Sequence, residues 1–88
     1  MTHRLKCVSP LFSDLVVGTK TFELRKNDRG YAVGDELVLC EVDDTGDETG
    51  RSLRRHVQYI LDAEAWRRAL PDEPPGLGEG YCILGLWP

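Results

Sequence analysis

The sequence holds 88 residues with a mass of 9.9 kDa, which is enough for one small domain and too short for a multidomain enzyme. Hydrophobic residues make up 41% and charged residues 30%, values that argue against a disordered chain and a membrane protein. No apolar run approaches the roughly 18 residues that cross a bilayer, and the first residues lack the apolar stretch of a signal peptide. We therefore expect a single domain over residues 1–88, a cytoplasmic location and no contact with membranes.

The formal net charge of −4 is unevenly distributed along the chain. Residues 1–35 carry six basic and four acidic side chains, whereas residues 36–50 carry six acids and no base. Residues 51–70 hold five arginines against two acids, and the remaining residues add three acids. The overall acidity argues against a general nucleic-acid coat, which is normally basic. The layout is compatible with a small basic face on an acidic body, and equally with an ordinary solvated surface of mixed charge.

The first part of the chain predicts two strands separated by a short helix. Apolar and polar residues alternate over His3–Val8, which indicates a half-buried strand. Ser9, followed by proline, is typical of an N-cap before the first helical residue, and Gly18 is typical of the end of a helix. Clean alternation over Thr21–Lys26 indicates the second strand.

The second part of the chain predicts three more strands and one helical segment. In the long strand, alternation places Tyr59 on the face of Leu53 and Val57, with Ile60 on the opposite face. Together these elements indicate an α+β class or a small barrel of about five strands with one or two short helices. The expected elements are strand Glu36–Val42, an acidic connection Asp43–Gly50, strand Arg51–Leu61, a helical segment Ala63–Leu70 capped by Asp62, a loop Pro71–Glu79 and strand Tyr81–Trp87.

The cysteines and histidines do not follow the spacing of a metal site. Cys7, Cys40 and Cys82 lie far apart among apolar neighbours and form no C-x-x-C pair, so we interpret them as reduced core residues. A catalytic or metal-bound thiol is the alternative. His3 and His56 are too few and too far apart to build a zinc site, so no metal and no cofactor are expected.

The most informative motif is G-x-K-x-x-E-x-R, which spans residues 18–25 at the junction of the first helix and the second strand. Lys20 comes just before the strand. Glu23 and Arg25 are two residues apart and project from one face, opposite the apolar side chains of this strand. Their charges must therefore meet solvent or line a cleft.

Together with T-H-R-L-K at residues 2–6 and G-Y-C-I-L at residues 80–84, this motif resembles the ASCH family, the activating-signal-cointegrator homology domains of the PUA-like superfamily. The sequence is most similar to a small, uncharacterised and often phage-borne branch of that family. The resemblance covers nearly the whole chain. It implies a small PUA-like β-barrel and nucleic-acid binding.

The leading hypothesis is therefore a module that binds RNA, or a modified nucleobase or nucleotide, in a cleft lined by Lys20, Glu23 and Arg25. A lysine and an arginine that bracket a carboxylate can bind a phosphate, while the carboxylate accepts hydrogen bonds from a base edge. Glu23 can instead fix Arg25 in a purely structural pair. Further candidates, each with a structural alternative, are Arg29 at the basic rim, Tyr31 as a stacking ring and His3 beside the motif.

The resemblance also leaves an enzyme open. Some ASCH relatives are amidohydrolases of acetylated cytidine that use a lysine, a threonine and a glutamate, and others are reported as ribonucleases. Lys20 matches that lysine, Glu23 stands where the threonine is found, and Glu64 lies in the region of the later glutamate. If the protein is an enzyme, Lys20 and Glu23 are the catalytic candidates. A third hypothesis is a protein-interaction factor that uses the acidic loop Asp43–Glu48.

Overall fold

The structure is a computed structural model that describes residues 1–72 and 77–88. Residues 73–76, inside the predicted loop Pro71–Glu79, lie outside the described residues. The predicted α+β class is confirmed, because five strands and two short helices follow the expected order. In the part of the chain that the structure describes, no helix is both long and apolar enough to span a membrane. The elements are β1 (Thr2–Val8), α1 (Ser9–Val17), β2 (Phe22–Lys26), β3 (Glu36–Val42), β4 (Glu48–Asp62), α2 (Ala63–Ala69) and β5 (Tyr81–Trp87).

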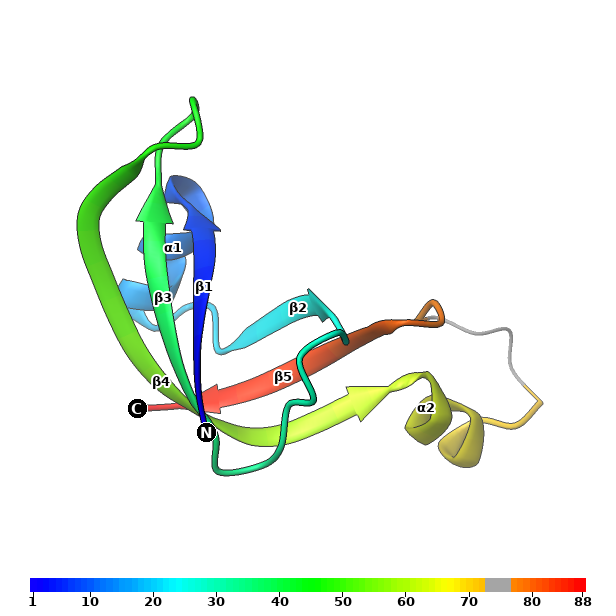
Figure 1. Ribbon diagram of the computed structural model, residues 1–88. Helices are drawn as coiled ribbons and strands as arrows, with labels where there is room; N and C mark the ends of the chain where they lie inside the picture. Colours follow the sequence, from blue (N-terminus) through cyan, green and yellow to red (C-terminus); the bar gives the residue numbers. More distant parts are fainter. Residues whose placement is uncertain (73–76) are drawn as a thin grey trace.

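All five strands belong to one curled sheet in the order β1-β3-β4-β5-β2. β1 is parallel to β3, and the other neighbouring strands are antiparallel. The 15-residue strand β4 makes the curl possible, since its first part pairs with β3 and its last part pairs with β5 (Figure 1). The sheet is thus a half-barrel, with β1 and β2 as its two edge strands.

The predicted alternation in β4 is wrong beyond Val57. The register shifts between Val57 and Tyr59, so that Gln58 is an extra residue opposite β5. One extra residue moves the side chains that follow it to the other face of the sheet. Tyr59 is therefore 63% exposed, whereas Ile60 packs against the core.

Helix α1 covers the concave side of the sheet and contributes Phe12 and Leu15 to the core. It begins one residue earlier than predicted, with Val8 as the N-cap. The hydroxyl of Ser9 donates to the carbonyl of Val42, 3.0 Å away, instead of capping the helix. The end of α1 at Gly18 is confirmed, because this residue is left-handed with a φ of 86°.

The core fills the inside of the curl. Its fully buried members come from α1 and from the middle of the strands, and the cysteines are free and buried as predicted. Asp62 caps α2 as predicted, since its carboxylate accepts from the N–H of Ala65 at 2.8 Å. The principal core residues are Leu5, Cys7, Phe12, Leu15, Leu37, Leu39, Val57, Cys82, Leu84 and Leu86.

Asp35 fastens the segment between β2 and β3 to the first strand. Its Oδ2 lies 2.8 Å from Nε2 of His3 and accepts from the N–H of Ala32 at 3.0 Å, while Oδ1 accepts from the amino group of Met1 at 3.2 Å. Its backbone carbonyl accepts from Val57 at 2.8 Å. The hydrogen bond with His3, followed by the bond with Ala32, lowers the pKa of the Asp35 carboxyl to about 2.

This pKa predicts a loss of stability in acid. An unfolded aspartate has a pKa of about 3.9. The ionised Asp35 therefore stabilises the fold above that pH, and its contribution disappears as the pH falls toward 2. In urea unfolding, we expect Asp35→Asn to be less stable than the wild type at neutral pH and to approach it near the pH of its folded-state pKa.

Asp44→Asn provides the control, because Asp44 is exposed in the hairpin between β3 and β4. This variant should follow the wild type at every pH. A difference between Asp35→Asn and the wild type that stays constant across the titration would contradict the role given to Asp35.

Candidate functional site

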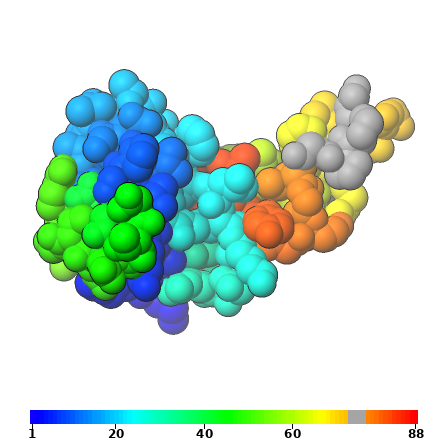
Figure 2. Space-filling model, turned by 90° about the horizontal axis from the view of Figure 1, so that it is seen from above, coloured from blue at the N-terminus to red at the C-terminus, as the bar shows by residue number. Residues whose placement is uncertain are grey.

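Arginine side chains connect the two edge strands of the half-barrel. Nη2 of Arg25, on β2, donates to the carbonyl of Lys6 on β1 at 2.6 Å. Nη1 of Arg29, just beyond β2, donates to the carbonyl of Arg4 at 3.2 Å. In Figure 2, β1 (dark blue) lies between the green hairpin and the cyan residues of β2 and its following loop. Side chains therefore hold together the edges that the sheet order leaves apart.

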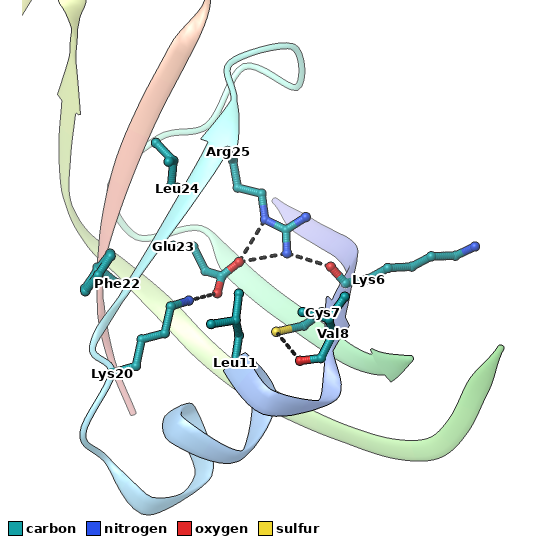
Figure 3. A pocket seen from close by; sticks show the side chains of 9 residues that line it. All are labelled: Lys6, Cys7, Val8, Leu11, Lys20, Phe22, Glu23, Leu24 and Arg25. Atoms are coloured by element: carbon teal, nitrogen blue, oxygen red, sulfur yellow. Dashed lines mark hydrogen bonds and ion pairs between the residues drawn. The ribbon is translucent and has the colours of Figure 1, made fainter. Parts of the chain in front are cut away.

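The regular alternation of side chains along a strand places Glu23 and Arg25 on the same face of β2, as predicted. Oε1 of Glu23 accepts from Nζ of Lys20 at 2.5 Å, and Oε2 accepts from Nε of Arg25 at 2.8 Å (Figure 3). The side chain of Glu23 is only 4% exposed, while those of Lys20 and Arg25 are 12% and 23% exposed. We call these three residues the ion triad.

The turn between α1 and β2 fixes the position of Lys20. The N–H of Lys20 donates to the carbonyl of Asp14 at 3.0 Å, and the hydroxyl of Thr19 donates to the same carbonyl. On the other side, the carbonyl of Thr21 accepts from Leu86 of β5 at 2.9 Å. The lysine therefore leaves the backbone at a defined point, and its Nζ reaches Glu23 while lying 5.3 Å from the ring centre of Phe22.

A pocket of about 500 Å³ lies at the ion triad. Its border is apolar and partly exposed: Val8 is 50% exposed and Leu11 is 45% exposed. The side chains of Phe22 and Leu24 point to the other side of β2 from Glu23 and Arg25, and both are exposed (Figure 3). The lining residues are Lys6, Cys7, Val8, Leu11, Lys20, Phe22, Glu23, Leu24 and Arg25.

The ion triad can bind a ligand that offers hydrogen-bond acceptors. An ammonium group has three donors, and Lys20 uses one of them on Glu23. Among the described residues, Nη1 of Arg25 donates no hydrogen bond. Both oxygens of Glu23 already accept from the cations. Carbonyl, carboxylate or phosphate oxygens therefore suit the charged part of the pocket, and an apolar ring suits its border.

Cys7 lines the pocket but is poorly suited to be a nucleophile. Burial, and then the negative charge of Glu23, raise the pKa of its thiol. The reactive thiolate is correspondingly disfavoured at neutral pH. Within residues 1–72 and 77–88, no three His, Cys, Asp or Glu side chains gather in a group that could hold a metal ion.

The structure brings only part of the predicted site together. Lys20, Glu23 and Arg25 meet in the pocket, and Arg29 lines a neighbouring cavity. His3 and Tyr31 do not line either cavity. Their rings lie 4.8 Å apart, His3 is bonded to Asp35, and Tyr31 packs against the core, which favours the structural alternative for both.

Sequence reasoning missed the wall of the pocket that β1 and α1 provide. Alternation in β1 does indicate that Cys7 faces inward and that Lys6 and Val8 face outward. No local pattern, however, indicates that β1 is one edge strand of the sheet and β2 the other. Leu11 carries no signal of its own, since an apolar residue in the first turn of a helix is usually a core residue.

The chain belongs to the family described as "Domain of unknown function (DUF3850)", whose model matches residues 2–86. It is also similar to an uncharacterized 12.9 kDa protein encoded in the GpA 3' region of Escherichia phage P2. The two are 34% identical over 64 residues, which cover 73% of this chain and 58% of the phage protein. The chain thus spans somewhat more than half of that relative. A function has to be argued from the pocket, because the family description states none.

The ion triad predicts that Glu23→Gln destabilises the fold. The amide keeps the shape of the side chain but leaves Lys20 and Arg25 without the negative charge between them. Removing one partner of a buried ion pair costs about 3–5 kcal/mol. Because the two cations are partly exposed, we expect Glu23→Gln to lower the free energy of unfolding by roughly 2 kcal/mol, measured by urea unfolding.

Glu48→Gln is the matched control for this substitution. Glu48 pairs with Arg4 at 2.9 Å, but the two side chains are 46% and 67% exposed. The expected loss is below about 1 kcal/mol, as for other surface pairs. Equal losses in the two variants would show that burial gives the ion triad no special role in stability.

Proposed function

We propose that this protein is a small PUA-like module of the ASCH type that binds single-stranded RNA, or a modified base or nucleotide, in the pocket at the ion triad. The observation that carries the proposal is the nearly buried carboxylate of Glu23, clamped between two cations that both line an open pocket. The G-x-K-x-x-E-x-R motif, the α+β half-barrel and the family match over residues 2–86 are compatible with this assignment.

The chemistry of the pocket suits an unpaired base. Proteins read single-stranded RNA by covering the face of a base and by hydrogen bonding to its edge. Val8 and Leu11 offer apolar contacts to a ring, while Lys20 and Arg25 offer donors to carbonyl oxygens or ring nitrogens. A volume of about 500 Å³ lies within the range of sites for small ligands.

The charge of the chain is consistent with a site that takes one or a few nucleotides. A protein of net charge −4 does not attract a long nucleic acid over its whole surface. The ion triad itself carries one net positive charge, since two cations flank one carboxylate. Binding should therefore weaken only gradually with added salt, because few phosphates are neutralised.

An NMR titration of isotope-labelled protein tests the proposal. The ligands are single-stranded RNA, duplex DNA and free nucleosides that include N4-acetylcytidine. We expect RNA to shift the amide signals of Lys20 to Arg25 and of Leu11, with the ligand chemically unchanged. Chemical conversion of a ligand in the same tube would show that the protein is a hydrolase and not only a binding module. No shift with any ligand would overturn the nucleic-acid role.

Lys20→Gln should weaken RNA binding at least ten-fold, since a hydrogen bond to a charged group contributes about 1.5–3 kcal/mol. Lys26→Gln is the matched control, because it removes the same charge from an exposed position at the end of β2, outside the pocket. Amide spectra of the free proteins check that both variants are folded. Equal loss of affinity in the two variants would mean that the pocket is not the binding site.

A further inference from the structure

A second cavity of about 340 Å³ adjoins the pocket and is lined mainly by cationic side chains. It shares Lys6 and Arg25 with the pocket, and Arg4 and Arg29 complete its basic wall. We call these four residues the basic groove. Glu48 is the one acidic residue that lines it among the described residues. The groove therefore carries an excess of positive charge on a protein that is acidic as a whole.

The fold creates the basic groove at the junction of the two edge strands. Alternation in β1 exposes Arg4 and Lys6 side by side on the outward face. Arg29 reaches across from the loop after β2 to the carbonyl of Arg4. Residues that are more than 20 positions apart in sequence thus form one surface.

The charges of the basic groove are only partly neutralised. Glu48 pairs with Arg4, and Glu23 pairs with Arg25. Within the described residues, neither Lys6 nor Arg29 takes part in an ion pair. The ammonium of Lys6 extends away from the ion triad in Figure 3. Two cations are thus left for an anionic ligand.

We propose that the basic groove holds the backbone phosphate of an RNA strand whose base occupies the adjoining pocket. The inference rests on the proposed function and narrows it, because a free nucleoside has no group for the groove. Lysine and arginine form charge-assisted hydrogen bonds with phosphate oxygens. Since Lys6 and Arg25 border both cavities, a base in the pocket brings its own phosphate to the groove.

The test compares an RNA trinucleotide with the corresponding free nucleoside. Dissociation constants are measured by NMR at two salt concentrations for the wild type, Lys6→Gln, Arg29→Gln and the control Lys26→Gln. We expect the wild type to bind the trinucleotide at least ten-fold more tightly than the nucleoside, and each groove variant to lose most of that advantage. Each lost phosphate contact should also lower the slope of log affinity against log salt by about 0.7.

Lys6→Gln is the cleaner variant, because the bridge from Arg25 uses the backbone carbonyl of Lys6 and the substitution leaves that carbonyl in place. Arg29→Gln instead removes the side chain that donates to the carbonyl of Arg4. Arg29→Gln should leave nucleoside affinity unchanged, because Arg29 does not line the pocket. The phosphate role of the groove would be overturned if the wild type bound the trinucleotide and the nucleoside with equal affinity, and if Lys6→Gln and Lys26→Gln had equal affinities for the trinucleotide. That result would not contradict the binding of a base in the pocket. Shifts at Lys6 and Arg29 without any at Lys20 would overturn the base pocket while supporting the groove.

Discussion

Arg25 makes the contact on which the open side of this protein depends. Its guanidinium donates both to Glu23 on its own strand and to the carbonyl of Lys6 on the opposite edge strand. β1 and β2 are the first and last strands in the sheet order, so no shared ladder holds them together. A side chain can bridge this gap without filling it. The bridge therefore holds the half-barrel in shape and leaves a pocket beside itself.

The ion triad is difficult to explain by stability alone. Withdrawing charged groups from water is costly, and well-packed apolar residues often stabilise a fold as much as a buried ion pair does. Inward-pointing charges can also protect an edge strand against pairing with other chains. That protection does not require a pocket with unused donors, which is what surrounds Lys20 and Arg25. The combination is the reason for placing function here.

Local sequence patterns predicted most of the elements because each depends on neighbouring residues. Alternation identified β2 and the shared face of Glu23 and Arg25, and Gly18 correctly marked the end of α1. The pattern failed at Gln58, where a bulge changes the face of the residues that follow. A bulge is an event between two strands, so the alternation of one strand does not reveal it.

The sequence by itself determined the class of the fold, the buried cysteines and the presence of a charged cluster at residues 20–25. Only the tertiary structure decided which way β2 faces, with Glu23 inside and Phe22 outside. It also decided that β1 supplies the opposite wall, through Lys6 and Cys7. The physical reason is that strand order and curl depend on contacts between distant segments. A local pattern gives the two faces of a strand, but the partner across the gap determines which face becomes a site.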